Sequence, residues 1–115
     1  MEVQVFGTKG HADTRKALRF FSERRIRVHF VDLRQRPASR GELTKFAQKH
    51  GVQALVDRES RRFVALGLAH TSLPDERWLE RLMAEPLLLR QPLVRQGQRF
   101  TVGLDAAAWR EWTGG

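Results

Sequence analysis

Residues 2–17 read EVQVFGTKGHADTRKA, and this stretch decides the fold. Val3 and Val5 alternate with polar residues, which predicts a short strand with one apolar face. A loop with two glycines follows the strand. Apolar residues then recur at helical spacing: Ala17, Leu18 and Phe21. The stretch therefore predicts a strand, a tight loop and a helix that ends near residues 24–25.

A second strand is predicted directly after this helix, at residues 26–32. Ile26, Val28 and Phe30 alternate with polar residues and would share one face. A strand, a helix and a strand in succession form a βαβ unit, whose two strands are parallel and whose crossover is right-handed. We therefore expect a parallel pair at the start of the sheet.

The middle of the chain carries helical patterns between proline and glycine breaks. Pro37 interrupts the chain, and Ser39 and Glu42 then have the spacing of a capping box that begins a helix. Gly51 suits the end of that helix. The segment 52–68 is apolar at scattered positions among charges, which favours short, irregular helical turns. A helical insertion is therefore expected at about residues 39–86.

A further helix and a hairpin complete the predicted fold. Residues 72–75 would begin the helix, with Pro74 in its first turn, and Pro86 would end it. Apolar runs around residues 93–94 and 100–102 flank a Gln-Gly-Gln turn and predict a hairpin. Asp105 can cap a last short helix. This order predicts one α/β domain over residues 1–115, with a thioredoxin-like (glutaredoxin-type) mixed sheet and a helical insertion.

The composition limits the chemistry that this chain can perform. It contains no cysteine, which excludes disulfides, thiolate metal sites and any mechanism that uses a protein thiol. The four histidines lack the spacing of a metal site, so no metal is expected. No export signal and no membrane-spanning apolar run is visible in the sequence. A cytoplasmic location without membrane attachment is therefore the prediction.

The charge balance is strongly basic, with 21 Lys and Arg against 13 Asp and Glu. The resulting net charge of +8 favours an acidic partner, either an acidic protein surface or a nucleic acid. The basic residues are scattered, without the interleaved aromatic residues of a base-stacking surface, which disfavours direct nucleic-acid binding. A simply solvated basic surface explains the same composition.

Several segments together resemble the arsenate reductase family, the group that includes ArsC, YffB and Spx. Its nucleophile loop reads approximately aromatic-Gly-x-Lys-x-Cys-x-x-x-Arg-Lys-Ala. The similar segments occur in the family's order: residues 6–17, 37–43, 51–57, 63–68, 85–94 and 102–105. The resemblance implies a thioredoxin-like fold, and in the reductases a thiolate that attacks an oxyanion held by arginines.

This chain departs from the family pattern at the residues that perform the reductase chemistry. The family's cysteine falls on His11, so the resemblance assigns no catalytic residue here. The arginine before the family's proline corresponds to Gln91, with Arg90 one place earlier. The other reductase arginine falls on Asp57, beside Arg58. The family's cysteine and two of its arginines are therefore replaced by other residues in this chain.

The remaining loop is still a candidate ligand site. A helix N-terminus presents free amides and a positive dipole end, which attract anions. Asp13 opposes an anion and is expected to cap the helix. By its similarity to the proline element of thioredoxin-like folds, the bond between Gln91 and Pro92 is predicted to be cis and close to His11. The candidate ligand-binding residues are Lys9, Gly10, His11, Arg15, Arg90, Gln91 and Pro92.

Two functions from different classes follow from the resemblance. The first is a catalytically degenerate member that acts by binding, for example a regulator that docks on RNA polymerase as Spx does, without redox sensing. The second is a thiol or arsenate reductase that requires no protein cysteine because bound glutathione supplies the sulfur. A loop that is only inherited scaffold is the simplest interpretation. No cofactor is expected, apart from glutathione in the second case.

Overall fold

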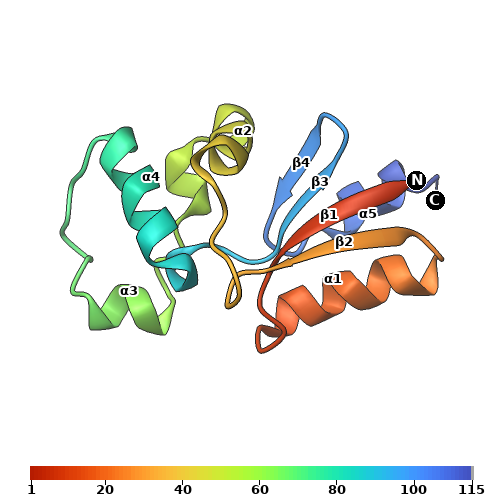
Figure 1. Cartoon of the computed structure of the whole chain (residues 1–115), viewed down its shortest axis with the longest axis horizontal. Coiled ribbons are helices and arrows are strands. Elements are labelled where there is room, and N and C mark those ends of the chain that lie inside the picture. Colours follow the sequence, from red (N-terminus) through yellow and green to blue (C-terminus); the bar gives the residue numbers. More distant parts are fainter. Residues whose placement is uncertain (115) are drawn as a thin grey trace. The chain divides into compact units, whose positions relative to one another are not determined.

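The computed structural model describes residues 1–114 and contains two compact units (Figure 1). The first unit combines Met1–Asp32 with the chain from Gln91 onward, and the second is Leu33–Arg90. Within residues 1–114, no helix is both long enough and apolar enough to cross a bilayer.

The first unit is built on a four-stranded mixed sheet. Its elements are β1 (Glu2–Gly7), α1 (Ala12–Glu23), β2 (Arg27–Asp32), β3 (Leu93–Gln96), β4 (Arg99–Val102) and α5 (Ala106–Trp112). The strand order is β2-β1-β3-β4. β1 and β2 are parallel, whereas β3 is antiparallel to both β1 and β4. The predicted βαβ unit, hairpin and mixed sheet are therefore confirmed.

Helices α1 and α5 pack on the same face of this sheet. Apolar side chains that are almost completely buried form the contact: Val3, Val5, Ala17, Phe21, Val94 and Trp109. The indole N–H of Trp109 donates to Oγ1 of Thr101 at 2.8 Å, so its one polar atom is satisfied inside the core. Burial of each valine or phenylalanine side chain among them contributes about 1.5–3 kcal/mol. Val3 and Val5, which alternate with polar residues in the sequence, thus both point into this core.

The second unit is helical. It contains α2 (Arg40–His50), the 3₁₀ turn η1 (Val52–Leu55), α3 (Arg61–Ala65), α4 (Asp75–Ala84) and the 3₁₀ turn η2 (Pro86–Leu88). Val56 and Leu89 form an antiparallel bridge beside these turns. The predicted helices and the irregular turns between them are confirmed.

The predicted place of Pro74 in the first turn of α4 is wrong by one position. Pro74 is the N-cap, with φ −62° and ψ 155°, and the helix begins at Asp75. The Pro74 carbonyl accepts the N–H groups of Arg77 and Trp78, as an N-cap carbonyl does. The extended ψ angle keeps Pro74 outside the helix although proline is compatible with a first turn.

The capping box at the start of α2 is confirmed and carries an ion pair. Oγ of Ser39 accepts the Glu42 N–H at 3.1 Å, and Oε1 of Glu42 accepts the Ser39 N–H at 2.8 Å. Both carboxylate oxygens of Glu42 also accept N–H groups of Arg36, each at 3.0 Å. The hydrogen bond from Arg36, helped by the Ser39 N–H, lowers the pKa of Glu42 below the ordinary value of 4.5.

We expect Glu42→Gln to lower the free energy of unfolding by about 0.5–1 kcal/mol at neutral pH, because glutamine keeps the capping bonds and loses only the charge. The folded pKa of Glu42 is depressed, so this difference is complete above pH 4.5 and disappears as the pH falls through the folded pKa. Urea unfolding of both proteins across this pH range measures it.

The exposed Glu59, in the same unit, provides the control. Among residues 1–114 Glu59 has no Arg partner, so Glu59→Gln removes the same charge and is expected to leave the stability unchanged within experimental error. An equal effect of both substitutions, or a Glu42→Gln difference that grows in acid, would contradict the assignment.

Candidate functional site

His11, at the position of the family's nucleophile, is the N-cap of α1. Its backbone is extended, with φ −88° and ψ 126°, and its Nδ1 accepts the Asp13 N–H at 3.2 Å. The imidazole thus occupies the role usually taken by a serine or aspartate oxygen. An accepting Nδ1 carries no proton, so the neutral ring holds its proton on Nε2. One first-turn amide is therefore already bonded to the protein itself.

The expectation that Asp13 caps this helix is wrong. Asp13 lies within the first turn, and its carboxylate is 3.8 Å from Nζ of Lys16. A carboxylate inside the first turn interacts favourably with the helix dipole, but it cannot cap, because the cap residue precedes the first helical residue. His11 takes that place because the helix begins at Ala12.

Gln91 holds the other side of the loop. Its Oε1 accepts hydrogen bonds from the Thr8 N–H at 2.7 Å, from Oγ1 of Thr8 at 3.1 Å and from Oγ1 of Thr14 at 3.2 Å. Gln91 is only 6% exposed, and both threonines are buried. The bond between Gln91 and Pro92 is cis, as predicted. One side-chain oxygen therefore ties the start of β3 to the loop and to α1.

Gly7 allows this close arrangement. A Cβ atom at Gly7 would lie 2.5 Å from Oγ1 and 2.8 Å from Cγ2 of Thr14, and 3.2 Å from Oε1 of Gln91. Distances this short are not tolerated, so any larger residue would displace Thr14 from Gln91. The glycine of the loop pattern is thus required by packing at the end of β1.

The charged candidates of the loop are exposed. Nη1 of Arg15 donates to the backbone carbonyl of Lys9 at 2.9 Å, which turns its side chain back onto the loop. Nζ of Lys9 lies 5.9 Å from the centre of the Phe30 ring. Gly10 is exposed as well. That these residues bind a ligand stays a prediction.

The remaining two candidates flank Gln91. Pro92 is buried in the first unit. Arg90 belongs to the second unit, where its backbone N–H donates to the Leu55 carbonyl at 2.8 Å and its side chain is exposed. Within residues 1–114, no group of three His, Cys, Asp or Glu side chains could hold a metal ion.

Thr8 and Thr14 are site residues that sequence reasoning missed. The hydrogen bonds that they donate to Gln91 span 83 and 77 residues, beyond any local pattern. The sequence held one indication of this contact. Two hydroxyl residues flank the nucleophile position, and a glutamine stands where the family has an arginine. A buried amide oxygen next to two threonine hydroxyls is a combination that satisfies all three groups.

A mixed sheet of this topology, a helix-opening loop after its first strand and a cis proline before β3 define a thioredoxin-like protein. The family assignment is equally direct. The ArsC family profile matches residues 6–112, so this chain belongs to the ArsC family.

Individual relatives agree with this assignment. The global transcriptional regulator Spx 2 of Oceanobacillus iheyensis is 28% identical over 105 residues, which cover 90% of this chain and 77% of the relative. A solved YffB protein has a TM-score of 0.87 and 24% identity, with 95% of this chain and 96% of that chain covered. An arsenate reductase from Vibrio cholerae has a TM-score of 0.78 and 19% identity, with 89% of each chain covered. At these identities the two solved structures show a common fold.

We expect Gln91→Leu to lower the free energy of unfolding by about 2–4 kcal/mol. The leucine removes the acceptor of three donors that stay buried, and buried donors without partners are costly. Gln98→Leu makes the same change at the exposed hairpin turn and is expected to cost less than about 0.5 kcal/mol. Urea unfolding of the three proteins measures both effects, and equal stabilities of the two variants would contradict the role given to Gln91.

Proposed function

We propose that this chain acts by binding an acidic protein partner, with RNA polymerase as the specific candidate, and not by thiol chemistry. The observation that carries the proposal is the contact between Nδ1 of His11 and the Asp13 N–H. At the position where the reductases of this family present a thiolate, this chain presents an imidazole that is used as a helix cap.

The hydrogen bonds around the loop support a binding role over anion chemistry. An incoming oxyanion would use first-turn amides and nearby arginines. The Asp13 amide is bonded to His11, and the Thr8 amide is bonded to Gln91. Arg15 donates to the Lys9 carbonyl. Three donors near the loop, the Asp13 amide, the Thr8 amide and one N–H of Arg15, are therefore already bonded to the protein itself.

The charge and the relatives favour an acidic macromolecular partner. The net charge of +8 attracts acidic surfaces at a distance. The relative Spx 2 is described as a global transcriptional regulator. RNA polymerase is the partner that a regulator of this kind would use, and it is the candidate that we propose for this chain. Because the chain has no cysteine, this binding would not depend on its own redox state.

Binding to purified RNA polymerase from the source organism tests the proposal. We expect saturable binding of the immobilised chain that weakens as salt rises, because screening reduces attraction between exposed charges. Binding is expected to be the same after treatment with dithiothreitol or with an oxidant such as diamide. Absence of saturable binding at physiological ionic strength would contradict RNA polymerase as the partner.

A turnover assay separates this proposal from an enzyme that uses glutathione. The wild-type chain is incubated with arsenate and reduced glutathione, and oxidised glutathione is followed by coupling to glutathione reductase and NADPH. We expect a rate equal to that of the protein-free control. Turnover that His11→Ala abolishes while leaving the amide spectrum intact would establish the glutathione-dependent enzyme and contradict the binding proposal.

A further inference from the structure

The sheet of the first unit has a second face that neither α1 nor α5 covers. This face carries the side chains that alternate with Val3 and Val5 along β1, together with their cross-strand partners. Near the loop they are apolar and buried, at Phe6, Val31 and Leu93. Toward the start of β1 the face becomes polar. We call this part the polar sheet end: Glu2, Gln4, Arg27, His29 and Arg95.

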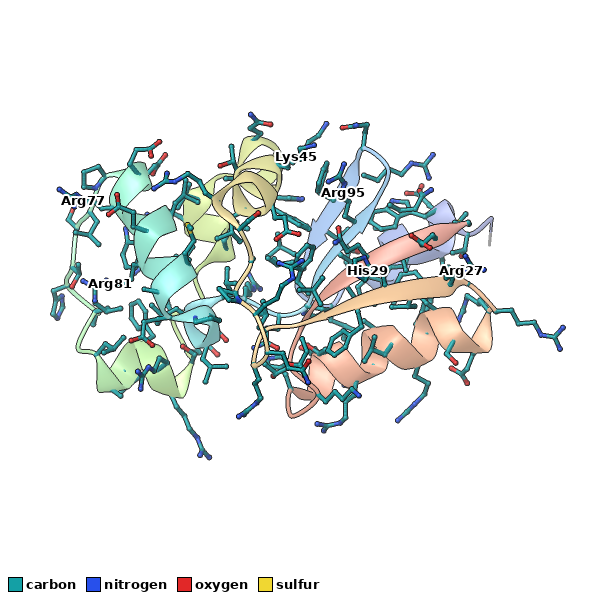
Figure 2. All side chains as sticks on the ribbon, in the orientation of Figure 1. Arg27, His29, Lys45, Arg77, Arg81 and Arg95 are labelled. Atoms are coloured by element: carbon teal, nitrogen blue, oxygen red, sulfur yellow. The ribbon has the colours of Figure 1, made fainter. Side chains whose placement is uncertain are left out.

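A straight row of side chains crosses the polar sheet end. Gln4 pairs with His29 on one side and with Arg95 on the other, so the three residues are direct neighbours on one face. Figure 2 shows His29 on β2 and Arg95 on β3, with Arg27 at the start of β2. A hollow of about 220 Å³ lies here, lined by residues that include Glu2, Gln4, His29, Arg95 and Gly97.

Arg95 is held in a fixed orientation. Its Nε donates to the Gly97 carbonyl at 2.9 Å, and its guanidinium carbon lies 5.1 Å from the centre of the Phe100 ring. A guanidinium held at one edge and packed against a ring can still offer its two Nη groups to a carboxylate. Orienting this side chain in advance reduces the entropy lost on binding.

The other basic groups of the polar sheet end are available. Arg27 and His29 are exposed, and among residues 1–114 neither forms an ion pair. By contrast, Arg36, Arg40 and Arg62 of the second unit all pair with glutamates. The imidazole of His29 and the amide of Gln4 add hydrogen-bond donors beside the two guanidinium groups.

We propose that the polar sheet end binds an acidic polypeptide segment through its carboxylates, with Arg95 as the central contact. Two arginines on one sheet face match carboxylates spaced along an extended chain. Phe100 is only 8% exposed, so it offers no free ring for base stacking.

This inference rests on the proposed function, which supplies the class of partner, an acidic protein. The inference adds the surface of this chain that would contact that partner. The probe is an acetylated and amidated hexaglutamate peptide, titrated into the ¹⁵N-labelled chain. We expect saturable amide shifts at Gln4, His29 and Arg95. The substitution Arg95→Gln is expected to weaken the affinity by about fivefold or more.

Arg99→Gln is the matched control, because Arg99 is exposed on β4 and alternates with Phe100, which places it on the opposite face. It removes the same charge and is expected to change the affinity by less than about twofold. Because Arg95 also packs on Phe100, Arg27→Gln is the second test variant, and we expect it to weaken binding about two- to fivefold. Equal effects of Arg95→Gln and Arg99→Gln would mean general attraction by net charge and would overturn the proposal.

Two further probes use the same labelled protein. Inorganic phosphate that shifts the same amides with an equal affinity would reveal a small-anion site and overturn the proposal. A single-stranded oligonucleotide that binds these amides more tightly than the peptide would also overturn it. Absence of saturable shifts with hexaglutamate would overturn the proposal as well.

The RNA polymerase assay distinguishes failure of this surface from failure of the proposed function. If the wild-type chain and Arg95→Gln bind RNA polymerase equally, the surface is wrong and the function stands. If hexaglutamate binds at the polar sheet end but RNA polymerase does not bind, the surface stands and that partner is wrong.

Discussion

Three hydrogen-bond donors, two from Thr8 and one from Thr14, converge on the side-chain oxygen of Gln91. These bonds connect the start of β3 with the loop after β1 and with the first turn of α1. Gly7 is required at the same place because a side chain there would collide with Thr14. The geometry around His11 depends on this arrangement, since the loop is anchored on both sides of the N-cap.

Local periodicity was sufficient to predict the elements of the fold. Val3 and Val5 alternate in the strand and enter the core, and Ser39 and Glu42 form the capping box that their spacing predicts. Assigning the caps was harder where two residues competed. At α1 the sequence favoured Asp13 because aspartate is a common N-cap, but the helix begins one residue after His11, and Nδ1 of His11 accepts the Asp13 N–H. At α4 the displacement is one position, because Pro74 is the N-cap and the helix begins at Asp75.

The contacts that shape the site could not be predicted from local patterns. Thr8 and Gln91 are 83 residues apart, and only the folded sheet brings them together. The resemblance to the family located His11 and the cis Gln91–Pro92 bond, because those positions are defined by motifs. It could not show that the side-chain oxygen of Gln91 accepts hydrogen bonds from Thr8 and Thr14. The polar sheet end was also invisible, because His29, Gln4 and Arg95 become neighbours only through the register.

This chain is an ArsC-family scaffold in which the capping imidazole of His11 and the amide of Gln91 occupy the positions of the family's thiolate and arginine. We propose that this loop is held by internal hydrogen bonds and does not bind a thiol or an oxyanion. The most direct test is an NMR titration of the ¹⁵N-labelled chain with reduced glutathione and, separately, with arsenate. We expect no saturable shift at millimolar ligand for the amides of Gly10, His11, Ala12 and Gln91. Saturable shifts confined to these amides would contradict it.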